Sequence, residues 1–220
     1  MVPMKKSGRY DTSDLIEDQY EGGSKGQVLK NIPGIKSLQE IGQREMRELL
    51  QATDELVDSY SHDHRFTAND ICNVHKIWLG STYEWAGHYR RVMISKGGFP
   101  FANPEFIPRL MAEFEKNILK KYTPCTFESW DQVIEALAIV HVEFLLIHPF
   151  REGNGRLARL ISTLMALQAG LPLLDFAEIE GEKKDEYFAA VRAGVNRDYK
   201  PMKKIFSEVI SRSEKFSEKG

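Results

Sequence analysis

The sequence predicts an all-α protein that contains one small β-hairpin. Apolar residues recur every three or four positions through most of the chain, which is the period of an amphipathic helix. Residues 89–101 depart from that period, because Tyr89, Val92 and Ile94 favour an extended strand and Gly97-Gly98 suits a tight turn. A hydrophobic fraction of 42% over 220 residues is enough to build a packed core.

The helices follow from the apolar spacing and from the residues that begin or end each segment. Pro149 ends the most strongly apolar helix, because proline lacks a backbone N–H and disfavours helix in the preceding residue. Gly170 and Pro172 close the helix that follows it, and Thr67 is a suitable N-cap for an earlier one. The expected helices cover residues 37–60, 104–122, 126–147, 154–169, 183–194 and 201–215, with one beginning after Thr67 and a short one over 13–20.

Composition divides the chain and excludes several classes of function. Residues 1–35 are rich in Gly, Lys and Asp and are interpreted as an arm that could regulate the main domain, 36–215, which a polar tail, 216–220, follows. The net charge of −2 gives no overall basic field, so no nucleic-acid partner is expected. The longest uncharged apolar stretch has 15 residues, fewer than the roughly 20 that a membrane span needs. With no secretory signal and two distant cysteines, Cys72 and Cys125, we expect a cytoplasmic protein.

The segment 148–159, HPFREGNGRLAR, joins two apolar helices through a glycine-rich loop. The second helix begins at the end of this loop, so its unpaired backbone N–H groups point into the loop and can bind an anion. Arg156 and Arg159 lie three residues apart on one face near that helix start, where cations are disfavoured. A polyphosphate would satisfy the N–H groups and both guanidinium groups together.

Two further side chains in this segment predict chemistry on that phosphate. Glu152 could hold Mg²⁺, which commonly binds one or two carboxylates together with phosphate oxygens. A neutral His148 at the mouth of the loop could accept a proton from an incoming hydroxyl. A base, a metal ligand and a phosphate cradle predict phosphoryl or nucleotidyl transfer. The alternative is a plain helix–turn–helix corner that carries a solvated basic patch.

This segment resembles the signature of the Fic domain family, HPFx[DE]GNGRxxR, and it matches at every specified position. Residues 83–90, YEWAGHYR, are similar to the family's WAGxxR-type segment, which precedes a hairpin called the flap. The resemblance covers about residues 25–210 and implies a Fic-type helical domain with one small β-hairpin flap. It also implies an enzyme that uses ATP and Mg²⁺ to transfer AMP to a Tyr, Thr or Ser hydroxyl of a target protein.

The resemblance assigns a role to each matching residue. His148 would be the base, Glu152 would hold Mg²⁺, and Phe150 would anchor the loop in the core. The phosphates would bind to Gly153, Asn154, Gly155, Arg156 and Arg159. The flap would hold the target as an added strand through Val92, Met93, Ile94, Ser95, Lys96 and Gly97. Tyr187 and Asn196 are candidate contacts for adenosine.

The N-terminal arm carries a second resemblance. Ser13 and Glu17 fit the SxxxE part of an inhibitory helix found in many Fic enzymes, although the next residue is Asp18 where the family has Gly or Asn. In such enzymes the glutamate pairs with the second arginine of the signature, so Glu17 would compete with the γ-phosphate for Arg159. The alternatives are a chance match, or a separate antitoxin-like protein that supplies the glutamate.

Several rival functions remain open from the sequence. The same scaffold could transfer phosphate, UMP or phosphocholine, or remove AMP, although the intact 153–156 segment, GNGR, favours nucleotidyl transfer. A toxin–antitoxin interaction module with little catalysis is the rival from another class, and the intact His148 and Glu152 argue against it. Delivery into another cell and assembly as a homodimer are left open. His141 shares a helix face with His148 and is expected to be a hydrogen-bonded core residue.

Overall fold

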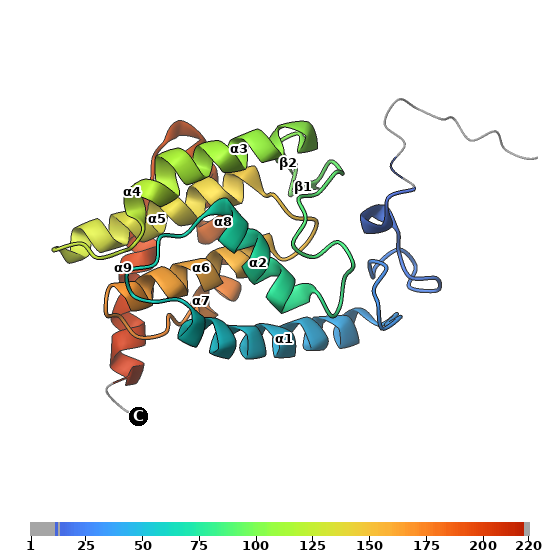
Figure 1. Ribbon diagram of the computed structural model, residues 1–220, viewed down its shortest axis with the longest axis horizontal. Helices are drawn as coiled ribbons and strands as arrows, with labels where there is room; N and C mark the ends of the chain where they lie inside the picture. Colours follow the sequence, from blue (N-terminus) through green and yellow to red (C-terminus); the bar gives the residue numbers. More distant parts are fainter. Residues whose placement is uncertain (1–11, 13, 218–220) are drawn as a thin grey trace, which may run out of the picture.

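The computed structural model describes residues 12 and 14–217, and its architecture confirms the predicted all-α fold with one hairpin (Figure 1). The helices are α1 (Leu38–Ser59), α2 (Ala68–Leu79), α3 (Ile107–Phe114), α4 (Lys120–Tyr122), α5 (Trp130–Ile147), α6 (Asn154–Gln168), α7 (Ala177–Glu180), α8 (Lys184–Ala193) and α9 (Lys200–Ser217). Short 3-10 turns cover Ile16–Asp18, Pro104–Phe106 and Gly194–Asn196, and a π-helical turn covers Glu115–Leu119. None of the helices in the described part of the chain could cross a membrane.

Helix α5 lies at the centre of the fold, packed against α3, α6, α8 and α9. It carries apolar residues around most of its circumference, and a helix of that kind is stable only when other elements cover all of its sides. Ser129 caps its first turn and accepts a hydrogen bond from the backbone of Gln132. This cap explains why α5 begins at Trp130 and not at Thr126, as the apolar pattern alone predicts. The neighbouring helices therefore hold α5 in place, and α6 follows it after the short loop 148–153.

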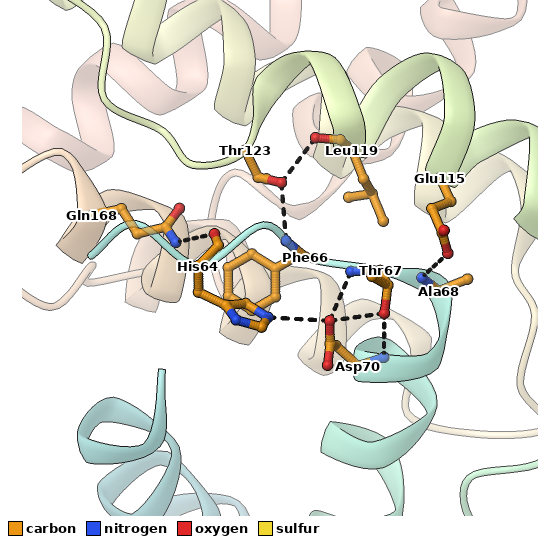
Figure 2. A network of polar contacts seen from close by, with 9 residues as sticks. All are labelled: His64, Phe66, Thr67, Ala68, Asp70, Glu115, Leu119, Thr123 and Gln168. Carbon is orange, nitrogen blue, oxygen red and sulfur yellow. Dashed lines mark hydrogen bonds and ion pairs between the residues drawn. The ribbon is translucent and has the colours of Figure 1, made fainter. Parts of the chain in front are cut away.

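The start of α2 is fixed by a polar network that confirms Thr67 as its N-cap (Figure 2). Thr67 and Asp70 form a reciprocal capping box, in which each side chain accepts a hydrogen bond from the other's backbone. Glu115 accepts a hydrogen bond from the Ala68 backbone at 2.7 Å, which ties the helix to the π-helical turn. Gln168 donates to the His64 carbonyl at 2.7 Å, which ties the same segment to the end of α6.

The hairpin turns at Gly97-Gly98 as predicted, but its strands are shorter than predicted. The antiparallel strands β1 (Ser95–Lys96) and β2 (Phe99–Pro100) pair Ser95 with Pro100 and Lys96 with Phe99. Residues 89–94, predicted as a strand, form no ladder, because the Arg90 N–H bonds with the Pro149 carbonyl and the Val92 carbonyl accepts a bond from the Arg90 guanidinium. The helix predicted over 104–122 is confirmed in its bounds, although its type changes along the chain from a 3-10 turn to α3, the π-helical turn and α4.

The N-terminal arm is partly built into the core, which corrects its interpretation as a separate appendage. Val28 and Leu29 are buried against the main domain, and the Ile32 N–H bonds with the Thr82 carbonyl at 2.9 Å. An isolated bridge joins Tyr20 to Leu29 and folds the arm back on itself. The short helix predicted over 13–20 is reduced to the turn Ile16–Asp18. Ser13 lies outside the described residues.

Close packing of α8 against α5 leaves no room for a side chain at Gly194. Its backbone is in the right-handed helical region, but an added Cβ would lie 2.1 Å from Cγ1 of Val142. We expect Gly194→Ala to lower the free energy of unfolding by about 1–3 kcal/mol through overpacking. The matched control is Gly42→Ala in α1, where nothing lies within 4 Å of an added Cβ and alanine should stabilise the helix by about 0.5–1 kcal/mol. Denaturant unfolding measures both, and a Gly194→Ala protein as stable as the parent would contradict the packing argument.

Candidate active site

A pocket of about 540 Å³ opens where the flap faces the end of α5, the start of α6 and one side of α8. It collects most of the residues that the sequence assigned to catalysis, phosphate binding and target docking. The lining residues are Met93, Ile94, Ser95, Lys96, Gly97, Phe99, Phe101, Leu145, His148, Arg151, Glu152, Gly153, Asn154, Gly155, Tyr187, Phe188, Val191 and Arg192. The predicted site residues Val92, Arg156, Arg159 and Asn196 are not among them.

His148 is the C-cap of α5 and adopts a left-handed backbone conformation, with φ 54° and ψ 60°. Its ring is stacked on the ring of Phe101 with 3.7 Å between centroids. The Nδ1 atom lies 3.1 Å from the Leu145 carbonyl oxygen, which can only accept a hydrogen bond. We therefore assign the proton to Nδ1, which leaves the lone pair on Nε2. Burial, with a smaller effect from the positive charges of Arg90 and Lys96, lowers the pKa of His148 to about 4, so the ring is neutral at pH 7.

The loop after His148 turns sharply at Gly153, whose φ is +84°. An added Cβ there would lie 2.8 Å from the Trp78 ring, so both the backbone conformation and the packing require glycine. The first helical hydrogen bond of α6 runs from the Leu157 N–H to the Gly153 carbonyl. The amides of residues 154–156 precede it and have no partner within the helix, which suits them to an anion.

Glu152 is the acidic residue nearest to this helix start. Its side chain is 47% exposed, it lines the pocket, and its Oε1 accepts a hydrogen bond from the Gly153 N–H at 2.8 Å. The described residues contain no group of three or more His, Cys, Asp or Glu side chains that could hold a metal ion alone. A single carboxylate fits Mg²⁺ that takes its other ligands from phosphate oxygens and water.

The side chain of Asn154 has a structural role that the sequence did not reveal. It is buried, its amide oxygen accepts a hydrogen bond from the Phe150 N–H at 2.9 Å, and its amide nitrogen donates to the Phe150 carbonyl at 2.7 Å. The side chain predicted to contact phosphate is thus committed to closing the loop. Phe150 is fully buried, which confirms that it anchors the loop in the core.

Arg156 differs from its predicted position. Its guanidinium forms an ion pair with the buried Glu45 of α1 at 2.8 Å and lies 4.8 Å above the Trp78 ring. Glu45 also accepts a 2.6 Å hydrogen bond from the Tyr83 hydroxyl, so it is fixed in place. The Nη2 atom that pairs with Glu45 also lies 3.5 Å from Oε1 of the pocket-lining Glu152, so the guanidinium bridges the two carboxylates. A phosphate contact by Arg156 therefore requires a change of its side-chain rotamer or a phosphate that extends beyond the pocket.

The remaining predicted ligands, Arg159, Tyr187 and Asn196, differ in how deeply they are buried and in whether they line the pocket. Arg159 is half-buried one helical turn after the loop. Tyr187 lines the pocket from α8, and its hydroxyl lies 2.6 Å from Nε2 of His141. His141 is buried and also contacts the Ser162 hydroxyl, which confirms the expected hydrogen-bonded core histidine. Asn196 is exposed in the 3-10 turn after α8 and does not reach the pocket.

The flap forms one wall of the pocket through residues 93–97. Val92 is buried at the base of the flap and does not line the pocket. The Lys96 amine crosses the pocket and lies 4.8 Å from the centre of the Phe188 ring on α8. Desolvation lowers the pKa of Lys96, and this effect outweighs the attraction of Glu152. The flap therefore adds a partly desolvated cation to a pocket suited to phosphate.

The arm meets the site at the root of the flap. Glu17 is buried, its Oε1 accepts a 2.7 Å hydrogen bond from the Arg91 N–H, and its backbone carbonyl accepts one from Arg151 Nε. Burial raises the pKa of Glu17 above its ordinary value, against the opposing effect of that hydrogen bond and of three arginines. The predicted contact between Glu17 and Arg159 is not present, because the carboxylate turns instead towards the flap.

His75 is a supporting residue that sequence reasoning missed. It is fully buried beneath the loop, and its ring stacks on Phe150 with 3.9 Å between centroids. Nδ1 accepts a hydrogen bond from the Gly87 N–H at 2.8 Å, so Nε2 carries the proton and donates to the Glu152 carbonyl at 3.2 Å. Burial lowers the pKa of His75 to about 3 and keeps the ring neutral. A single histidine in an apolar helix gives no signal for this role.

Comparisons with known proteins agree with this geometry. The sequence model of the Fic/DOC family matches residues 65–166. "Protein adenylyltransferase fic-1" of Caenorhabditis briggsae is 29% identical over 139 residues, which are 63% of this chain and 26% of the relative. "Probable protein adenylyltransferase Fic" of Escherichia coli K12 is 28% identical over 194 residues, which are 84% of this chain and 88% of the relative.

A solved structure has the same fold. It is the BepC protein of Bartonella tribocorum, described as a VirB-translocated effector with bound AMPPNP. The TM-score is 0.69 at 24% identity, and the match covers 89% of this chain and 97% of that one. Residues 65–166 of the chain therefore match the Fic/DOC family model, and the chain as a whole has the fold of the BepC structure. The chain spans only about a quarter of the nematode relative, so that protein's whole activity does not carry over to this chain.

The protonation of His148 can be measured directly. Since its folded-state pKa is about 4, we expect its ring to remain neutral from pH 8 to pH 5 in a side-chain NMR titration. The unfolded chain binds that proton near the usual value of 6.5, so His148 lowers stability as the pH falls from about 6.5 towards 4. The His148→Asn protein identifies the resonance. A titration midpoint above pH 6 would contradict the burial argument.

Proposed function

We propose that this protein is an adenylyltransferase that moves AMP from ATP to a Tyr, Thr or Ser hydroxyl of a target protein. The observation that carries the proposal is the position of His148, which lines the pocket as a neutral ring with its lone pair on Nε2. The amides at the start of α6 and the cation of Lys96 provide a place for the triphosphate beside that atom. The adenylyltransferase names of the relatives support the same assignment.

The residues suggest how the transfer proceeds. The flap presents the target segment, and Nε2 of His148 takes the proton of the target hydroxyl. The oxygen bonds to the α-phosphorus of ATP while the bond to the bridging oxygen breaks, which releases pyrophosphate. The N–H groups at the start of α6 stabilise the negative charge on the phosphates. Mg²⁺ bound by Glu152 would neutralise further charge on the phosphates.

The family also supports narrower proposals about partners and setting. A separate antitoxin-like protein could supply an inhibitory glutamate, and a homodimer is compatible with the fold. We place the reaction in the cytoplasm, either of the producing cell or of another cell, since the related BepC is described as a translocated effector. Transfer of phosphate, UMP or phosphocholine, or removal of AMP, remains the rival for the same site. Phosphate transfer would label the target from the γ-phosphate of ATP, whereas the other three reactions would leave it without label from ATP.

The first test follows the label of ATP in a cell lysate. We expect protein labelling from α-labelled ATP and none from γ-labelled ATP, and labelling should require added Mg²⁺. His148→Ala should lower the rate by about 10²–10⁴-fold, because it removes the general base. The exposed His88 gives the matched control, since His88→Ala should label normally. Label from the γ-phosphate alone would replace adenylyl transfer with a kinase reaction. No label from either would favour an interaction module, an inhibited enzyme or one of the rivals that takes no group from ATP.

We further propose that the arm limits activity through the flap and not through Arg159. Its support is the bond from the Arg91 N–H, directly before the flap, to the Glu17 carboxylate. Glu17→Gly should raise self-modification from α-labelled ATP several-fold, because the flap root is released. The exposed Asp14 of the same arm provides the control Asp14→Gly, which should leave the rate unchanged. An unchanged rate in Glu17→Gly would exclude regulation by this contact.

A further inference from the structure

Arg90 is a buried arginine that joins the flap to the catalytic loop. Its side chain is 1% exposed, although guanidinium groups are rarely buried. Nε donates to the His148 carbonyl at 2.8 Å, Nη1 to the Val92 carbonyl at 2.7 Å, and Nη2 to the Ala102 carbonyl at 2.6 Å. The planar guanidinium thus contacts His148, the residue assigned as the base, and the backbone on both sides of the hairpin. The Arg90 backbone N–H adds a 2.8 Å bond to the Pro149 carbonyl.

The surroundings explain how the cation is tolerated. Its partners are carbonyl oxygens, and the His148 carbonyl lies at the C-terminal end of α5, where the helix dipole favours a positive charge. Burial lowers the pKa of Arg90 to about 10, so the group remains charged at pH 7. Two neighbouring charges shift this pKa in opposite directions, since the carboxylate of Glu17 raises it and the guanidinium of Arg151 lowers it.

The geometry has a mechanical consequence. Val92 and Ala102 flank the hairpin on its two sides, so bonds to both carbonyls fix the direction in which the flap leaves the domain. The third bond fixes the residue whose ring faces the pocket. A guanidinium holds these three acceptors at set angles because its donors lie in one rigid plane, whereas a lysine amine has no such fork.

We propose that Arg90 is a positioning residue that sets the distance between a target docked on the flap and Nε2 of His148. It touches neither nucleotide nor target. This inference rests on the proposed adenylyl transfer, in which a target hydroxyl must approach Nε2 closely. A displacement of about 1 Å in such an arrangement can lower the rate about 10²-fold.

The experiment compares Arg90→Lys and Arg90→Met with Arg91→Lys and Arg91→Met. Arg91 is the exposed neighbour, and its substitution keeps the backbone N–H that donates a hydrogen bond to the Glu17 carboxylate. The readouts are self-modification from α-labelled ATP, AMPPNP affinity by calorimetry, and NMR of the His148 ring together with the amides of residues 92–97. Both Arg90 variants should lose about 10²-fold in rate while AMPPNP affinity changes less than about threefold, since the start of α6 is not touched.

NMR separates positioning from loss of structure and from failure of the proposed activity. In both Arg90 variants the resonances of His148 and of the flap should shift together, while those of α9 stay in place. The His148 pKa should rise further in Arg90→Met than in Arg90→Lys, because lysine keeps the positive charge. Unshifted His148 and flap resonances, or an unchanged rate, would overturn the positioning role. A parent protein that gives no label would count against adenylyl transfer, and the NMR comparison would still decide the role of Arg90.

Discussion

The site depends first on the closure of the loop between α5 and α6. Two hydrogen bonds between the Asn154 side chain and the Phe150 backbone close it from above, and the His75 ring supports it from below. These contacts fix the distance from His148, at one end of the loop, to the first amides of α6, at the other. A base and an anion site can work on the same phosphate only if that distance is constant. Elsewhere the helices serve mainly to bury this loop.

Electrostatics around the loop give different roles to one histidine, one arginine and one lysine. His148 is neutral because it is buried near positive charges, so it can accept a proton at the pH of the cell. Arg156 is paired with Glu45 and with the pocket-lining Glu152, so two carboxylates offset its charge. Lys96 adds a cation from the flap wall. The positive charge around the pocket therefore comes from the flap as well as from the signature segment.

The sequence predicted the helical class, the N-cap of α2 and the loop between α5 and α6, because these depend on short-range patterns. It could not predict contacts between distant segments. The ion pair of Arg156 with Glu45 and the bond of Glu17 with Arg91 join residues far apart in the chain. His75 gave no signal either, since a lone histidine in an apolar helix does not reveal its partners, and the WAGxxR-type match that contains Arg90 did not reveal the acceptors of its guanidinium. The hairpin was predicted too long, because the backbone N–H groups of Arg90 and Arg91 bond to Pro149 and Glu17 and not to a strand.

Trp78 gives the site a built-in optical reporter. Its indole ring lies directly beneath Gly153 and beneath the guanidinium of Arg156, and its Nε1 donates to the Glu45 carbonyl. Any nucleotide that draws Arg156 away from Glu45 also removes the cation from the face of this indole, which changes its emission. The fluorescence of one buried tryptophan therefore records whether the first arginine of the signature faces the protein or the phosphate.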